Sequence, residues 1–406
     1  ALEARRSGSS GFRASAPRRS IPAAAMGVHS KMEGEMPPPG TKNRGWFYVC
    51  TPEAANPEAA KIFELRDAEM PEVGPGMILT RTLATAVAPH TRAFLNLPGN
   101  DVGAEAIGLT RTEIGEPVPC EFVGEVIVSR SRKYAVGDRV ASFSPLFDYC
   151  ALRDDARMPP TRLPSSATTE KALVMGAGLT AHLVINHHPC GRVSEPGCGA
   201  GLAGCMSFLR RRPEKTVLVT SAAGGVGCVA GQIYKAKGCR VIGVTSTREK
   251  ADKILEYGFD AAIAYKEESL DKRLGELAPE GLDIFFDNVG AEQLDAGSRH
   301  MKVGGRIVQV GCAAEIDNYA SGDIRGWKEY HRMAARELQV GGFLMTNHLA
   351  KIPGSVLSLM LMTARGKVKT AETVVHGGLD RWAECVDRLH SGDCFGRLVL
   401  CTDGSK

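Results

Sequence analysis

The sequence predicts an α/β protein, with a doubly wound parallel sheet in one domain and a smaller, mostly β domain before it. The first observation is an alternation of strand-like and helical segments after about residue 170. The strand candidates are 216–220, 240–245, 259–265, 282–287, 305–311 and 337–344. Successive strands joined by crossover helices are typical of a parallel sheet with helices on both faces. The second observation is a glycine-rich turn directly after the first of these strands.

The chain begins with a segment that is not expected to fold. Residues 1–44 are rich in Ala, Arg, Ser, Pro and Gly, and are predicted to be a disordered N-terminal extension. Residues 1–25 contain five Arg and one acidic residue, a composition that resembles an organelle transit peptide. Met26 is an alternative first residue of the protein, and in that case we expect a cytoplasmic location.

Short strand signals dominate residues 45–170, for example at 46–49, 77–80, 125–128 and 139–143. The tail, residues 371–406, returns to a helix at 379–389 and a strand at 397–401, and is predicted to complete this β-rich domain. Residues 171–370 then form the doubly wound domain, with an insertion at 190–212 before its first sheet strand. Such connections usually have about two to six residues, so the insertion is interpreted as a surface loop.

Composition excludes several classes of function. The chain of 406 residues is 43% apolar and 24% charged, as in ordinary globular proteins. Its net charge of +4 is concentrated in residues 1–44, which hold eight basic and three acidic residues, so the rest carries no basic footprint for nucleic acid. No apolar run reaches the ~20 residues that cross a bilayer. The twelve cysteines include no CxxC pair, which favours reduced thiols.

The glycine-rich turn predicts a dinucleotide site. The β-branched strand at 216–220 leads into Gly224, Gly225, Val226 and Gly227, and a helix follows. Glycines at this point let the backbone approach a pyrophosphate, whose charge is then met by the amides at the helix N-terminus.

The end of the second strand indicates which dinucleotide binds. NAD sites usually place a carboxylate about 20 residues after the glycines, where it binds the ribose 2′-hydroxyl. Here residues 245–248, which include Ser246, offer hydroxyls and an Arg, and Lys250 is close behind. Because these groups suit a 2′-phosphate, we predict NADP(H) and expect Glu249 to face outward. The alternative is a helix N-terminus with ordinary solvated charges.

Several motifs, in the right order, resemble the zinc-independent medium-chain dehydrogenase/reductases, and among them the enone reductases of the prostaglandin reductase (leukotriene B4 dehydrogenase) type. They are Val-Gly-Asp-Arg-Val at 136–140, Gly-Leu-Thr-Ala at 178–181, Ala-Ala-Gly-Gly-Val-Gly at 222–227, Phe-Asp-Asn-Val-Gly at 286–290 and Gly-Phe-Leu-Met at 342–345. The resemblance covers about residues 45–402 apart from the insertion. It implies a Rossmann domain joined to a GroES-like domain.

The resemblance also implies which residues contact NADP(H). Lys250 and Tyr265 match positions that contact the 2′-phosphate, and Asn288 matches an Asn that meets the cofactor. The other cofactor-binding candidates are Thr180, Gly311, Cys312, Phe343, Leu344 and Met345. One departure is Cys394, which replaces an Asn that contacts NADP(H) in the family.

The same comparison predicts a mechanism without a metal. Zinc-dependent relatives carry a Cys ligand near residues 87–88, a His-Glu pair, and a third ligand near Ala177. Here Cys120 and Glu121 replace the pair, and the other two positions are apolar. One thiolate and one carboxylate cannot supply the three protein ligands of a catalytic zinc ion. Reduction of an enone C=C bond needs only positioning and a hydrogen-bond donor to the carbonyl oxygen.

Two residues are candidates for that donor. Tyr319 lies two residues after Asp317, which occupies the position of the family's Tyr, and takes the role if the loop shifts. His90 replaces a Tyr that lines the family's substrate cleft. The alternative for Tyr319 is an aromatic side chain that packs on the surface, and the alternative for His90 is a loop histidine without a catalytic role. His348 is expected to be a solvated loop histidine, and the alternative is a position near the cleft.

The resemblance therefore implies an NADPH-dependent reductase of α,β-unsaturated ketones and aldehydes. The alternatives are a quinone oxidoreductase of the zeta-crystallin type and a non-catalytic NADP-binding protein. The expected partner is a small enone or quinone, with no nucleic acid and no membrane. The edge strand near 337–344 is expected to pair across a two-fold axis and form a homodimer, as it does in relatives.

Overall fold

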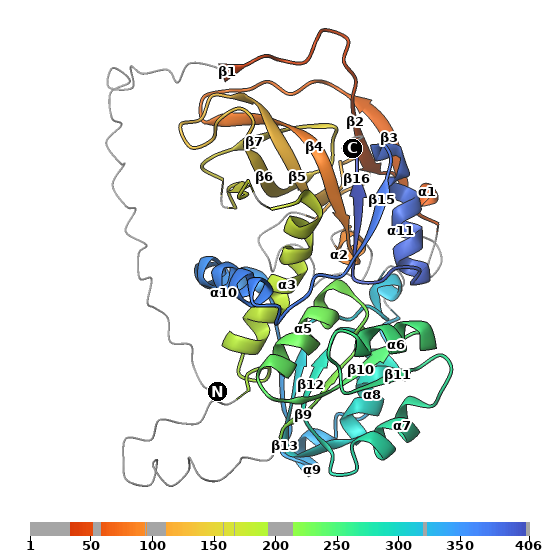
Figure 1. Ribbon diagram of the computed structural model, residues 1–406. Coiled ribbons are helices and arrows are strands. Elements are labelled where there is room, and N and C mark those ends of the chain that lie inside the picture. Colours follow the sequence, from red (N-terminus) through yellow and green to blue (C-terminus); the bar gives the residue numbers. More distant parts are fainter. Residues whose placement is uncertain are drawn as a thin grey trace, which may run out of the picture.

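The computed structural model describes residues 33–51, 58–93, 95, 111–156, 158–165, 167–193, 214–319 and 323–402. The described residues form two domains, each with its own sheet, and helix α3 (Thr169–His187) runs from one toward the other (Figure 1). Beyond Val193, the predicted insertion at 190–212 lies outside the described residues.

The larger α/β domain contains a six-stranded parallel sheet. Its strands are β9 (Thr216–Val219), β10 (Arg240–Thr245), β11 (Ala261–Ala264), β12 (Leu282–Asp287), β13 (Met301–Gln309) and β14 (Gln339–Gly342). Neighbouring strands pair in the order β11-β10-β9-β12-β13-β14, and every pair is parallel. This is the 3-2-1-4-5-6 order of a doubly wound Rossmann sheet. All six predicted strands are confirmed, most with shifted or shortened ends.

Helices cover both faces of this sheet because its strands are apolar on both sides. Val217 and Val219 face one core cluster, with α3 and α5 (Gly225–Ala236), whereas Leu218 faces the other. The remaining helical elements of this domain are α6 (Arg248–Leu255), α7 (Leu270–Leu277), α8 (Ala291–Arg299), η4 (Ile316–Tyr319), α9 (Arg332–Ala335), η5 (Met345–Lys351) and α10 (Ile352–Ala364).

The second domain is the mostly β, GroES-like one. Its main sheet has the path β15-β16-β4-β5-β6-β8, with β1 paired to β5 and β7 paired to β4. The strands are β1 (Glu33–Gly34), β4 (Met77–Val87), β5 (Pro119–Ser129), β6 (Arg139–Pro145), β7 (Tyr149–Arg153), β8 (Thr161–Arg162), β15 (Glu372–His376) and β16 (Arg397–Cys401). A hairpin of β2 (Asn43–Tyr48) and β3 (Phe63–Ala68) accompanies it, with α1 (Ala59–Ile62), α2 (His90–Ala93), η6 (Leu379–Arg381) and α11 (Trp382–Ser391).

The chain's tail is part of this sheet, since β16 pairs antiparallel with β4 (Figure 1). The N-terminal boundary needs a correction. Within the predicted disordered extension 1–44, β1 already pairs with β5 and β2 begins at Asn43. Ordered structure therefore starts before residue 44, because strand pairing holds a segment whose composition alone predicts disorder. Residues 1–32 lie outside the described part of the chain.

Two further findings concern the described residues as a whole. None of their helices combines the length and the apolar character required to cross a bilayer. None of their cysteines takes part in a disulfide.

Candidate functional site

The glycine turn lies between β9 and α5, at the carboxyl edge of the parallel sheet. Gly224 is the N-cap of α5, whose first turn carries no acidic side chain. A Cβ at Gly227 would lie 2.2 Å from the carbonyl oxygen of Ser221, so only glycine lets the helix pack this closely on the turn. The first amides of a helix have no intrahelical acceptor. The turn thus presents N–H groups without a competing carboxylate, as an anion site requires.

A buried hydrogen-bond network fixes the neighbouring strand ends. Thr220, after β9, donates its hydroxyl to Oδ1 of Asp287 over 2.8 Å. The Asn288 backbone N–H donates to Thr220 Oγ1 over 2.8 Å, and the Asn288 side-chain amide donates to the Thr220 carbonyl over 2.7 Å. Asp287 is fully buried, and this desolvation raises its pKa although N–H groups of Val289 and Gly290 oppose the shift. The predicted residue Asn288 is therefore held beside the glycine turn.

The loop after β13 wraps over the same residue. The Gly311 amide donates to the Asp287 carbonyl over 3.3 Å, and a Cβ at Gly311 would lie 2.9 Å from the Asn288 carbonyl oxygen. Cys312 is next to Gly290. The predicted pair Gly311 and Cys312 is thus brought to Asn288, at the point where the strand order reverses between β9 and β12. Open α/β sheets bind ligands at this switch point.

The end of β10 carries the groups predicted for the 2′-phosphate. Ser246 follows the strand directly, and Thr247 caps α6 by accepting the Lys250 backbone N–H. The Lys250 ammonium donates to the carbonyl of Gly392 in the other domain. Tyr265 is 39% exposed, and its backbone N–H binds the Thr245 carbonyl over 3.0 Å.

Charges of both signs surround these groups, since the Glu267 carboxylate accepts the Arg248 backbone N–H over 2.7 Å. Glu249 is exposed, as expected from the sequence. Arg248 is paired with Glu268 over 3.3 Å. Ser246, Lys250 and Tyr265 supply a hydroxyl, an ammonium and a phenol. The chemistry of this donor set fits a phosphate monoester.

The segment after β14 carries the remaining cofactor-binding candidates. The Phe343 amide donates to the Gln309 carbonyl over 3.0 Å, and Thr180 of α3 contacts Met345 Sδ at 3.7 Å. His348 stacks on Phe343, with ring centroids 5.0 Å apart and planes 10° apart. One face of the His348 ring is therefore covered by an aromatic ring, while the residue stays partly exposed.

The two catalytic candidates start and end short helices that lie next to each other. His90 is the first residue of α2, and Tyr319 is the last residue of η4. The two helices pack together, so a β-domain segment and a Rossmann-domain loop meet there. Only the backbone of these two residues is described, so their roles stay predictions.

The positions that hold zinc ligands in zinc-dependent relatives are engaged otherwise here. Burial raises the pKa of the Cys120 thiol to about 12, so the thiol is protonated at neutral pH. Glu121 Oε2 accepts from Arg397 Nη2 over 2.5 Å. The other carboxylate oxygen of Glu121 occupies the space that a Cβ on Gly176 of α3 would need. The described residues contain no group of three or more His, Cys, Asp or Glu side chains that could hold a metal ion.

Arg397 is a candidate that the sequence analysis missed. The residue is 9% exposed, and its Cβ and Cα lie within 3.5 Å of the place that a Cβ added to Gly225 of the glycine turn would take. Its Nε is buried and has no hydrogen-bond partner. Its Nε therefore keeps an unused donor, while its Nη2 is bound to Glu121. The available signal was a single cation at the start of an otherwise apolar last strand.

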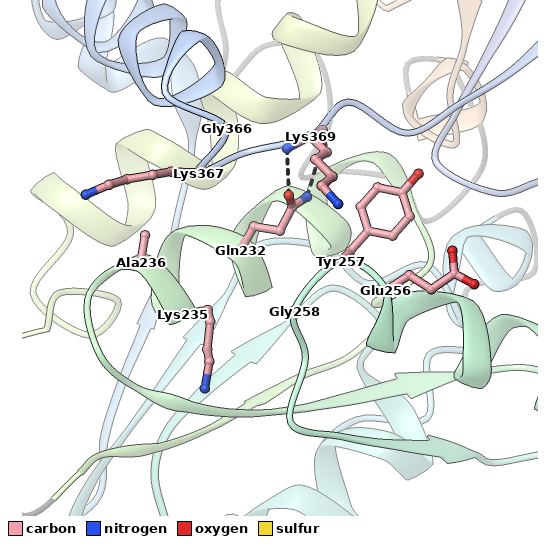
Figure 2. A pocket seen from close by; sticks show the side chains of 9 residues that line it. All are labelled: Gln232, Lys235, Ala236, Glu256, Tyr257, Gly258, Gly366, Lys367 and Lys369. Carbon is pink, nitrogen blue, oxygen red and sulfur yellow. Dashed lines mark hydrogen bonds between the residues drawn. The ribbon is translucent and has the colours of Figure 1, made fainter.

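A separate hollow of about 290 Å³ lies at the opposite end of α5 (Figure 2). Gln232 lines it and binds the backbone of Lys369 through both amide atoms. Lys235 is paired with Asp260, and the side chains of Lys367 and Lys369 point in different directions (Figure 2). Because its cations do not converge, this hollow is not a candidate for the cofactor.

Comparisons with known proteins agree with this geometry. A family model described as zinc-binding dehydrogenase matches residues 225–361, and one described as the N-terminal domain of oxidoreductase matches residues 44–159. Together they span both domains. The chain belongs to the medium-chain dehydrogenase/reductase family.

Similarity to individual members extends along most of the chain. Prostaglandin reductase 1 of Oryctolagus cuniculus is 28% identical over 337 residues, which are 82% of this chain and 87% of that protein. A probable quinone oxidoreductase of Leishmania amazonensis is 35% identical over 199 residues, 47% of this chain and 58% of the relative. The crystal structure of CurA from Vibrio vulnificus matches with a TM-score of 0.74 and 25% identity, covering 90% of this chain and all of that one. CurA has also been crystallised in complex with NADPH.

Proposed function

We propose that the chain is an NADPH-dependent reductase of the C=C bond of α,β-unsaturated ketones and aldehydes. The observation that carries this is the phosphate-type donor set at the end of β10, formed by Ser246, Lys250 and Tyr265. The similarity to prostaglandin reductase 1 over 82% of the chain supports the same reaction class.

The residues divide into groups that would hold different parts of NADPH. The amides of Gly225, Val226 and Gly227 and the guanidinium of Arg397 would bind the pyrophosphate. Ser246, Lys250 and Tyr265 would bind the 2′-phosphate. Thr180, Asn288, Gly311, Cys312 and the 343–345 segment would surround the nicotinamide end. When bound, NADPH supplies the hydride that reduces the β-carbon of the enone.

The chain's own part in the chemistry is positioning and stabilisation of charge. Negative charge develops on the substrate's carbonyl oxygen during reduction, and a donor placed there lowers the barrier. We propose Tyr319 as this donor, through its phenolic O–H, and His90 as a second donor from the facing helix α2. A bulky side wall is supplied by Phe343, which His348 holds by stacking.

A quinone oxidoreductase is the second candidate. It is favoured by the higher identity, 35%, to the probable quinone oxidoreductase of Leishmania amazonensis, although that similarity covers only 47% of the chain. The two activities are separated by NADPH consumption assays with trans-enones, enals, nitroalkenes and quinones. A kcat/KM at least tenfold higher for an enone supports the proposal, and a higher value for a quinone contradicts it. Binding of NADPH without turnover on any of these compounds favours a non-catalytic binding protein.

The Tyr319 assignment has its own test. Tyr319→Phe removes the phenolic donor and keeps the ring, so we expect kcat on the preferred enone to fall about 10²-fold while KM for NADPH stays constant. Unchanged turnover on every active enone contradicts the assignment.

The assembly and the location are further proposals. β14 is an edge strand with half-exposed residues, and we propose that it pairs with its counterpart in a second copy to form a homodimer. Size-exclusion chromatography with light scattering tests this. We propose a cytoplasmic location, with organelle import if residues 1–25 act as a transit peptide, and imaging of fusions with and without these residues decides between the two.

A further inference from the structure

The turn after α11, residues 392–396, rests on helix α6 of the other domain. Lys250 donates its ammonium to the carbonyl of Gly392. One helical turn further, the Lys253 ammonium lies over the ring of Phe395, 4.3 Å from the ring centroid. Lys250 and Lys253, which lie on one face of α6, are therefore both bound to the same turn of the GroES-like domain.

The turn is also held from other sides. The Phe395 ring is 9% exposed and contacts the ring of Tyr257, with centroids 5.4 Å apart. The Gly396 amide donates to the carbonyl of Ala223 in the glycine turn over 2.7 Å. The Gly392 amide binds back to α11, where the residue adopts the left-handed conformation that ends the helix. The carbonyl that accepts from Lys250 is therefore fixed in place.

We propose that Phe395 determines specificity for the phosphorylated coenzyme by fixing Lys250. The inference rests on the proposed function in one respect, that a 2′-phosphate binds beside Lys250. Phe395 acts through Lys250 and the turn, and is therefore a positioning residue. It is outside the set of residues that the family resemblance implies.

The physical reason lies in the lysine side chain. A free ammonium on a flexible four-carbon chain loses rotamer freedom when it binds a phosphate. Here the Gly392 carbonyl, at the negative C-terminal end of α11, already restricts Lys250. An ammonium has three N–H donors, so one bound to Gly392 leaves two for phosphate oxygens. With Lys253 bound to Phe395, the turn and α6 stay together and the restriction persists.

The two coenzymes make the inference testable. NADH has no 2′-phosphate, so its affinity does not depend on Lys250. Loss of the Phe395 contact should weaken the binding of NADPH alone. A general loosening of the interface between the domains should weaken the binding of both coenzymes.

The experiment measures Kd for NADPH and for NADH by fluorescence titration of the full chain without substrate. We expect Phe395→Leu and Lys253→Met to raise Kd for NADPH about threefold to tenfold and to change Kd for NADH less than twofold. Phe395→Tyr and Lys253→Arg keep a ring face and a cation, and should behave as the wild type. Lys253 is exposed, so its variants remain informative if Phe395→Leu does not fold.

A matched control removes the same type of contact elsewhere. Arg66 lies over Phe47 at 5.6 Å in the β2–β3 hairpin, so Arg66→Met should leave the ratio of the two Kd values unchanged. Equal effects of Phe395→Leu on both coenzymes, or no effect of either Phe395→Leu or Lys253→Met on NADPH, would overturn the inference. If the wild type binds NADH as tightly as NADPH, the coenzyme proposal and this inference fall together. If it prefers NADPH but reduces no enone, only the proposed reaction fails.

Discussion

Replacing Gly227 by Ala tests how the glycine turn is built. The new Cβ would lie 2.2 Å from the Ser221 carbonyl oxygen and 2.8 Å from its carbonyl carbon. These are backbone atoms, and Ser221 already has a φ of 51°, a conformation that L residues adopt at a cost. The strain must therefore move the start of α5. Overpacking of this kind costs about 1–3 kcal/mol of unfolding free energy.

The assay combines thermal unfolding with cofactor titration. For a domain of this size about 1 kcal/mol corresponds to roughly 2–4 °C, so we expect Gly227→Ala to lower Tm by about 2–12 °C. Because a displaced helix start no longer aims its amides at the pyrophosphate, NADPH and NADH should both bind about tenfold more weakly. Gly354→Ala in α10 is the matched control, since nothing lies within 4 Å of its added Cβ. Gly227→Ala with wild-type Tm and affinity would refute this account of the turn.

Three further predictions concern single side chains. Lys250→Met should raise Kd for NADPH at least tenfold and leave Kd for NADH within twofold in the same titration, and a parallel loss for NADH would contradict its assignment to the 2′-phosphate. Arg397→Met should weaken the binding of both coenzymes, because both carry the pyrophosphate. It should also lower the free energy of unfolding by about 1–3 kcal/mol, because Glu121 loses its partner. Weaker binding of NADPH alone would argue against this role. Burial lowers the pKa of His182 to about 4, below the unfolded value of about 6.5, so the unfolded chain binds the proton more tightly. Stability should be complete above pH 6.5 and fall by about 2 kcal/mol at pH 5 in urea titrations, and His182→Gln should reduce this loss.

The elements that the sequence predicts best are those with local signals. The six parallel strands follow from strand-like segments that alternate with helical ones, and the glycine turn is visible because its geometry requires glycine at fixed spacing. The boundary at residue 44 is missed because β1 is held by pairing with β5, which composition does not reveal. The stacking of His348 on Phe343 is a second feature that the sequence does not reveal, because only the fold brings the two rings together.

The parts of the site that sequence reasoning misses depend on contacts between distant residues. Glu121 and Arg397 are 276 positions apart, and Lys250 and Gly392 are 142 positions apart. Neither pair belongs to a periodic pattern, so each becomes visible only when the chain's tail joins the GroES-like domain. The family resemblance predicts a role for each residue separately. The contact of Lys250 with the opposite domain cannot be predicted in this way, because it exists only when both domains are folded together.

The central claim is that Ser246, Lys250 and Tyr265 form a site for the 2′-phosphate of NADPH. It is tested most directly by calorimetric titration of the purified chain with NADPH and, separately, with NADH. The account predicts that NADPH binds at least tenfold more tightly, as expected when an ammonium and two hydroxyl groups meet an additional phosphate. Equal or tighter binding of NADH would contradict it.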